Sequence, residues 1–182
     1  MSGSFGSAPR DQASSRSTLT WVFAEPSGWS RTRDPASYLY AELFDEQAIV
    51  HGPRGSGFYL RGNLEVPVID AADDLLLVVW VSVSGADFER AHALWNDPRR
   101  ADEPAYFGRL CNRIPGYPDT WHLDVYVHTR PIGRRPLIEL EPSDHPLVAD
   151  QKRGVPAARA VQIANALDAA LDERVDLTEV AR

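Results

Sequence analysis

The segment that most constrains the fold is a long apolar stretch, LLLVVWVSVS, at Leu75–Ser84. Its first half is apolar at every position, which a strand tolerates when both of its faces are covered. Toward its end, Val79, Val81 and Val83 alternate with other side chains at the two-residue period of a strand. The chain is therefore expected to fold around this segment as the central strand of a sheet.

Shorter segments of strand-like composition surround this central strand. They are Leu19–Phe23, Phe58–Gly62, Leu64–Asp70, Ala105–Asn112, Thr120–His128 and Leu137–Glu141. The Thr120–His128 segment alternates most regularly, with Trp121, Leu123, Val125 and Val127 on one face. Pro67 has no amide hydrogen to donate within a sheet, so its strand is expected at an edge or a bulge. The glycine-rich segment His51–Gly57 is expected to be a loop.

Four segments carry helix signals. Asp34 followed by Pro35 predicts a helix that runs to about Gln47. Ser84 with Asp87 three residues later resembles a capping box and predicts a helix to about Asn96. A short helix is expected at about residues 144–153, followed by Gly154 as its stop. The last helix is expected to start near Pro156, with an apolar stripe at Val161, Ala164, Leu167, Leu171 and Val175.

Strands in runs, with single helices between them and helices gathered at the end, follow the order of an α+β fold. We expect one mainly antiparallel sheet of about five to seven strands with helices packed on one face. Residues 1–18 are rich in serine, glycine and alanine, so we expect a disordered tail there. Residues 19–182 are then expected to form a single domain.

Composition excludes several classes of function. The net charge of −7 argues against nonspecific binding to nucleic acid. Cys111 is the single cysteine, which excludes an intramolecular disulfide and a cysteine-based zinc site. The longest apolar run, Leu75–Val81, is far shorter than the roughly 20 residues that span a bilayer, and residues 1–20 lack the apolar core of a signal peptide. We expect a soluble, cytoplasmic protein with no nucleic-acid or membrane partner, no metal and no cofactor; its oligomeric state stays open.

Four segments carry a resemblance to a known family: FYLRGNLEVPVID (58–70), VWVSVSGADFERAHALW (79–95), YFGRLCNRIPGYPDT (106–120) and VHTRPIGRRPLIELEPSDHPLVADQKRGV (127–155). They resemble the bacterial domain-of-unknown-function family 2199. It covers roughly residues 57–170 and implies no particular activity, since the family is uncharacterised. Many relatives begin with a C-x-x-C-G-x-x-H element that resembles half of a zinc site. The corresponding segment here, LTWVFAEPSGW, has neither cysteine, and Trp21, Phe23 and Trp29 are expected to fill that space by apolar packing.

One region reverses the sign of the chain's charge. Residues 99–135 contain seven arginines and four acidic residues, a net charge of +3. Because a guanidinium group binds carboxylate or phosphate through two parallel hydrogen bonds, this region is a candidate anion site. The candidate ligand-binding residues are Arg109, Arg113, Tyr117, Arg130, Arg134 and Arg135, with Tyr106, Phe107 and Trp121 as an aromatic rim. The alternative is that the arginines pair within the fold with Glu65, Asp119, Glu139 and Glu141.

Histidines supply weaker catalytic candidates. On the strand Thr120–His128, His122 and Asp124 share one face and could chelate a metal together with His128 or His145, although such a face is also the ordinary wet side of an antiparallel strand. Asp144 next to His145 suggests an acid/base pair, although Ser143 and Asp144 are also common helix caps. Cys111 has no evident activating base and is expected to be a buried structural residue.

We therefore favour a non-catalytic binding or interaction domain whose partner is an acidic protein surface or a small anionic ligand. The alternative is a small hydrolase or metal-assisted enzyme that uses His128 and His145 with a nearby carboxylate such as Asp119 or Asp144. The absence of any phosphate-loop, dinucleotide, nucleophile-elbow or zinc motif favours the first hypothesis.

Overall fold

The computed structural model describes residues 17–27, 40–43, 46–52 and 55–179. Strands dominate this part of the chain, and α-helices are few. The strands are β1 (Ser17–Val22), β2 (Tyr40–Leu43), β3 (Gln47–Gly52), β4 (Gly55–Val66), β5 (Val68–Ile69), β6 (Asp73–Val83), β7 (Tyr106–Leu110), β8 (Asp124–His128), β9 (Leu137–Leu140) and β10 (Val155–Pro156). The helical elements are α1 (Gly85–Ala93), the short 3-10 helix η2 (Pro98–Asp102), α2 (Pro146–Arg153) and α3 (Ala157–Glu179).

Five strands close into a mixed barrel in the order β4–β6–β7–β8–β9 and back to β4. Each neighbouring pair is antiparallel except β9 and β4, which run parallel. β1 pairs in parallel with the first half of β6, while β7 pairs with its second half. The antiparallel hairpin of β2 and β3 extends the sheet from β4.

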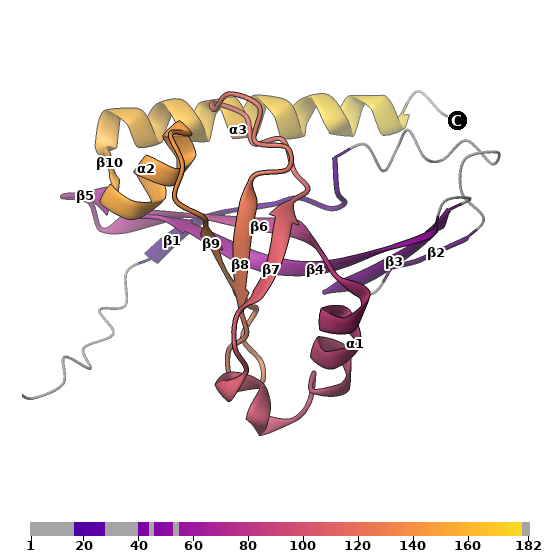
Figure 1. Ribbon diagram of the computed structural model, residues 1–182. Helices are drawn as coiled ribbons and strands as arrows, with labels where there is room; N and C mark the ends of the chain where they lie inside the picture. Colours follow the sequence, from indigo (N-terminus) through magenta and orange to yellow (C-terminus); the bar gives the residue numbers. More distant parts are fainter. Residues whose placement is uncertain (1–16, 28–39, 44–45, 53–54, 180–182) are drawn as a thin grey trace, which may run out of the picture.

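The expected α+β fold, a single mainly antiparallel sheet with helices on one face, is therefore wrong. The molecule is mostly strand, and its sheet curves until β9 meets β4. Figure 1 also shows α2 and α3 on one side of the barrel and α1 on the opposite side. The reason for the error is that local patterns predict strands but not the long-range pairing that closes a sheet.

Glycine makes the closing seam possible. A Cβ atom on Gly62 would lie 2.5 Å from Cδ1 of Ile138 and 3.0 Å from the carbonyl oxygen of Pro136. Only a residue without a side chain lets β4 and β9 approach this closely. The seam is short, because Asn63 and Leu137 form its one ladder pair and the Asn63 amide donates to the Pro136 carbonyl over 2.8 Å.

The central position predicted for Leu75–Ser84 is confirmed. β6 pairs with β1, β4 and β7, and its residues 77–81 are all buried. Alternate side chains of the other barrel strands point inward, among them Leu60, Leu64, Val125, Val127, Ile138 and Leu140. The outer face of β6 is covered as well: Trp80 is fully buried, and its ring nitrogen donates to the carbonyl oxygen of Phe23 over 3.1 Å.

The helix predicted from Ser84 is confirmed, since the Ser84 side chain accepts a hydrogen bond from the Asp87 amide at the start of α1. The helix predicted around residues 144–153 is α2, and it is capped by His145 rather than by Ser143 or Asp144. The buried face of α3 is Ala160, Ile163 and Leu167, whereas Val161 is 58% exposed. The predicted apolar stripe is therefore wrong at its first residue, Val161. Among the described helices, none combines the length and the apolar character needed to span a bilayer.

Some predictions fail near the N-terminus. Tyr40–Leu43 and Gln47 lie in strands, so the predicted helix to Gln47 is wrong there; residues 34–39 and 44–45 lie outside the described ranges. Hairpin pairing of β2 and β3 outweighs the local helix signal. The predicted loop at His51–Gly57 is mostly the end of β3 and the start of β4. The predicted disordered tail, residues 1–18, overlaps strand β1 at Ser17 and Thr18. Its other residues, 1–16, lie outside the described ranges.

Two other predicted strands need correction. The segments on either side of Gly62 form one strand, β4, which ends before Pro67; β5 then leaves the barrel and pairs with β10. The strand predicted at Thr120–His128 begins only at Asp124, because His122 has a φ of 66°. This left-handed backbone interrupts the strand, so His122 and Asp124 do not form the shared metal-binding face that the sequence suggested.

Candidate functional site

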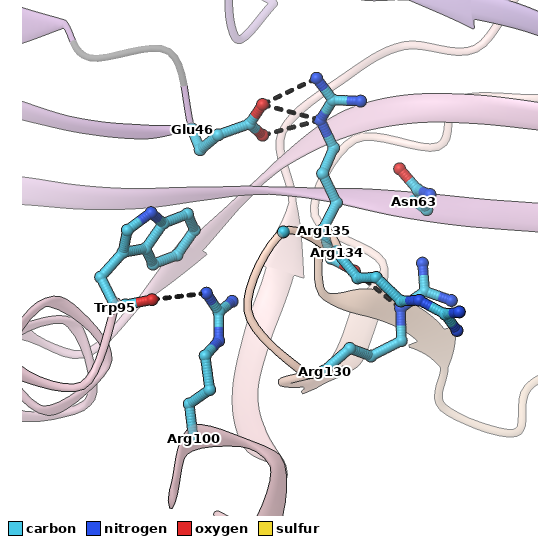
Figure 2. A pocket seen from close by; sticks show the side chains of 8 residues that line it. Glu46, Asn63, Trp95, Arg100, Arg130, Arg134 and Arg135 are labelled. Atoms are coloured by element: carbon cyan, nitrogen blue, oxygen red, sulfur yellow. Dashed lines mark hydrogen bonds and ion pairs between the residues drawn. The ribbon is translucent and has the colours of Figure 1, made fainter. Parts of the chain in front are cut away.

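A pocket of about 410 Å³ lies beside the seam between β4 and β9. Its lining combines residues from four parts of the chain: Glu46 before β3, Asn63 on β4, Trp95 and Arg100 after α1, and Arg130, Gly133, Arg134 and Arg135 in the loop between β8 and β9. Figure 2 shows Trp95 and Arg100 on one side and the arginines of the β8–β9 loop on the other. The pocket therefore gathers four guanidinium groups from two separate segments.

Arg100 is the most unusual of these residues. It is only 3% exposed, and its guanidinium carbon lies 4.4 Å from the centre of the Trp95 ring. Its Nη1 donates to the Trp95 carbonyl oxygen over 2.8 Å. Its Nε and Nη2 are buried and have no hydrogen-bond partner among the described residues. Burial lowers the pKa of this guanidinium from its ordinary value.

The local sequence explains why Arg100 points inward. Asp97 caps η2 by accepting a hydrogen bond from the Arg99 amide over 2.9 Å, and Pro98 occupies the start of the turn. The Arg99 side chain folds back onto the Asp97 carboxylate at 2.6 Å and stays exposed. The next residue, Arg100, is directed toward the barrel, and the Thr129 hydroxyl donates to its carbonyl oxygen.

The unpartnered atoms of Arg100 have a particular chemical meaning. Nε and Nη2 form the edge of a guanidinium group that donates two parallel hydrogen bonds to a carboxylate or a phosphate. A buried charge without a counter-ion costs several kcal/mol, so folded proteins pair such groups. Arg100 thus has a buried edge that can donate two parallel hydrogen bonds, and no carboxylate among the described residues binds it.

The loop arginines are partnered to different degrees. Arg135 binds the Glu46 carboxylate through Nε at 2.8 Å and Nη2 at 2.7 Å, and this hydrogen bonding raises the pKa of Arg135. Arg130 donates through Nε to the Arg135 carbonyl over 2.7 Å, and its Nη1 lies 3.6 Å from the Glu65 carboxylate. The side chain of Arg134 is exposed and makes no hydrogen bond or ion pair with any residue that the structure describes.

The six residues predicted as an anion site fall into two groups. Arg130, Arg134 and Arg135 line the pocket. The remaining three, Arg109, Arg113 and Tyr117, do not. Arg109 pairs with Asp124 at 3.1 Å on the outer face of the barrel, and Arg113 pairs with Asp119 at 3.1 Å.

Tyr117 donates its hydroxyl to Asp150 on α2 over 3.0 Å, and burial raises its pKa. None of the residues predicted as an aromatic rim, Tyr106, Phe107 and Trp121, lines the pocket. Phe107 contacts Tyr126 in an edge-on arrangement, and Trp121 stacks with His122. The internal pairing considered as an alternative is found for Arg113 with Asp119 and for Arg130 with Glu65.

The sequence hypothesis missed Glu46, Asn63, Trp95 and Arg100. Arg100 lies inside the positively charged window of residues 99–135, which is the one signal that pointed to it. Nothing in the pattern separates Arg99 from Arg100, because both follow the same turn. The burial of Arg100 depends on Trp95 and on Thr129, which follows β8, because both contact Arg100 in the folded chain.

The structure does not bring the catalytic candidates together. His128 lies opposite Leu137, at the start of β9, in the β8–β9 ladder. Its Nε2 atom lies 2.8 Å from the Glu139 carboxylate. His145 follows the other end of β9, where its Nδ1 accepts a hydrogen bond from the Leu147 amide over 3.2 Å. Asp144 is exposed beside it.

Metal and thiol chemistry receive no support from the described geometry. Across residues 17–27, 40–43, 46–52 and 55–179, no group of three or more His, Cys, Asp or Glu side chains could hold a metal ion. Cys111 is buried as expected, and burial raises the pKa of its thiol. A raised pKa keeps the thiol protonated and so makes it a poor nucleophile.

Comparison with known proteins identifies one family. The model of a family described as "Uncharacterized protein conserved in bacteria (DUF2199)" matches residues 13–155, a range that includes every residue lining the pocket. The match begins nearer the N-terminus, and ends earlier, than the resemblance over residues 57–170 indicated. No curated protein matches the chain, and no solved structure matches it.

Proposed function

The chain belongs to DUF2199, a family of uncharacterised bacterial proteins, and we propose that it is a non-catalytic binding domain for a small oxyanion, either a carboxylate or a phosphate. The observation that carries the proposal is the buried guanidinium of Arg100, whose Nε and Nη2 have no partner within the described chain. An oxyanion in the pocket would accept both of these hydrogen bonds.

Three other arginines of this protein use the same edge of the guanidinium group, Nε and Nη2, to bind a carboxylate. Arg90 binds Glu103 through Nε at 2.8 Å and Nη2 at 2.7 Å, and Arg99 binds Asp97 through the same two atoms at 3.0 and 2.6 Å. Arg135 uses them on Glu46. In each case the partner is a carboxylate with two oxygens. The chemistry that fits Arg100 is therefore that of an external oxyanion.

The shape of the site supports a small ligand rather than an acidic protein surface. A volume of about 410 Å³ lies in the range of small-molecule pockets. The guanidinium that needs a partner belongs to a residue that is 3% exposed, so it does not lie on a flat, open face. The wall formed by Trp95 can contact an apolar part of the ligand. A cytoplasmic location, compatible with a single buried cysteine, is part of this proposal.

The test is calorimetric titration of the purified protein with acetate and with inorganic phosphate. Two charged hydrogen bonds contribute roughly 1.5–3 kcal/mol each in favourable cases, so Arg100→Met is expected to weaken binding at least tenfold. Arg99→Met is the matched control, because Arg99 is adjacent, exposed and paired with Asp97. Its affinity is expected to equal that of the unmodified protein.

Two outcomes contradict the proposal. The first is that neither acetate nor phosphate binds the unmodified protein. The second is that Arg100→Met and Arg99→Met both bind with the affinity of the unmodified protein. A circular dichroism spectrum of each variant, compared with that of the unmodified protein, separates loss of the site from loss of the fold.

A further inference from the structure

We propose that the ligand is a compact dianion, namely a phosphate monoester of a small organic molecule. This inference rests on the proposed function and narrows it to one class of anion. It derives from the charge of the site, from the directions of its donors and from the volume around them.

The charge of the site exceeds what one carboxylate neutralises. Four arginines line the pocket, and the carboxylates that line it or pair with those arginines are Glu46 and Glu65. Four positive and two negative charges leave a net charge of +2 among the described residues. A monocarboxylate would leave half of this charge uncompensated, whereas a phosphate monoester carries nearly two negative charges above its second pKa of about 6.

The donors approach the pocket from two sides. Arg100 comes from η2 below Trp95, and Arg134 with Arg130 comes from the β8–β9 loop (Figure 2). The acceptor sites of a carboxylate lie in one plane, and a guanidinium edge takes one site on each of its two oxygens. The three terminal oxygens of a phosphate monoester point in different directions, so they can accept from guanidinium groups on both sides at once.

The pocket is larger than the charged group alone requires. Its volume of about 410 Å³ is more than ten times the roughly 30 Å³ that one molecule occupies in liquid water. Trp95 gives the pocket an aromatic wall, and the flat indole suits an organic substituent better than a hydrated ion. This is why we infer a monoester with an organic part rather than inorganic phosphate.

The experiment compares methyl phosphate with dimethyl phosphate by calorimetric titration of the full chain. The two share a tetrahedral phosphate but carry about two charges and one charge at pH 7.5. We expect methyl phosphate to bind at least tenfold more tightly at pH 7.5, and this advantage to shrink toward pH 5 as methyl phosphate becomes a monoanion. Dimethyl phosphate keeps one charge throughout, so its affinity reports any titration of the protein itself.

A variant connects this preference with the pocket. Arg134→Gln lowers the net charge to +1 and is expected to reduce the preference for methyl phosphate severalfold. Arg134 is exposed, so its replacement leaves the core intact. Arg113→Gln is the control, since Arg113 is exposed and paired with Asp119 away from the pocket. It is expected to keep the full preference.

The outcomes separate this inference from the proposed function. Equal affinity for the two phosphates, or tighter binding of acetate, overturns the dianion inference while an Arg100-dependent anion site stands. Absence of binding by all of these probes overturns both. A serine-phosphorylated peptide that binds far more tightly than glycerol phosphate overturns the small-molecule assignment and assigns the site to a phosphorylated protein.

Discussion

Arg90 and Arg100 are ten residues apart but differ in both solvent exposure and hydrogen bonding. Arg90, on α1, has a side chain that is 58% exposed, yet both atoms of its Nε and Nη2 edge bind the Glu103 carboxylate. Arg100 is 3% exposed, and the same two atoms have no partner among the described residues. Water could solvate Arg90 without help, whereas Arg100 needs a partner. Stability alone favours the reverse arrangement, and the proposed anion site rests on this difference.

The largest expected effect is a rise in thermal stability with ligand that depends on Arg100. At a methyl phosphate concentration one hundred times its Kd, binding to the folded state adds about 2.7 kcal/mol. For a chain of this size the midpoint of unfolding then rises by roughly 5–10 °C. Thermal melts with and without ligand measure this. At the same ligand concentration, the rise should fall to about half or less in Arg100→Met, because its binding is at least tenfold weaker, and should persist in full in Arg90→Met. An undiminished rise in both variants removes the distinction between the two arginines.

The next effect converts a paired arginine of the pocket into an unpaired one. Glu46→Gln removes the carboxylate that binds Arg135 and raises the net charge of the pocket from +2 to +3. Affinity for methyl phosphate is expected to increase about fivefold, which corresponds to roughly 1 kcal/mol. Calorimetric titration measures it, with Glu139→Gln as control because Glu139 pairs with His128 outside the pocket. Weaker binding by Glu46→Gln would mean that Glu46 serves the ligand directly.

A third prediction concerns stability without ligand. In a low-salt zwitterionic buffer, Arg100→Met should be as stable as the unmodified protein or more stable by about 1 kcal/mol, since a buried charge without a partner is replaced by an apolar chain of similar length. Arg90→Met should be no more stable, because it loses the bond to Glu103. Urea unfolding of both variants checks this. A strongly destabilised Arg100→Met would show that Arg100 is a structural residue after all.

The smallest effect is a difference in acid stability. The hydrogen bond from Arg90 lowers the pKa of Glu103 below its ordinary value of 4.5. A carboxyl group with a lowered folded-state pKa adds stability above the unfolded pKa and loses it as pH falls through the folded one. Unfolding midpoints from pH 6 to pH 3 should therefore decline more for the unmodified protein than for Arg90→Met. Arg100→Met, tested alongside, should follow the unmodified protein, and parallel curves for all three would count against a stabilising Arg90–Glu103 pair.

Local patterns predicted the elements whose partners are close in sequence or whose composition is extreme. The apolar run of β6 required cover on both faces, and the Ser84 side chain accepts a hydrogen bond from the Asp87 amide at the start of α1. The arginines of the β8–β9 loop were also predicted as anion ligands, and three of them line the pocket. The helix predicted toward Gln47 failed because residues 40–43 and 47–52 gain more from strand pairing than from a local cap.

The sequence by itself determined a strand-rich core around β6 and an excess of positive charge in residues 99–135. Only the tertiary structure decided that the sheet closes at Gly62 and that Arg100, not Arg99, is buried beside that seam. Hydrophobic period and helix caps act over a few residues, so they can be recognised along the chain. Closure of the barrel and burial of Arg100 depend on β9, Trp95 and Thr129, and folding brings them together with β4.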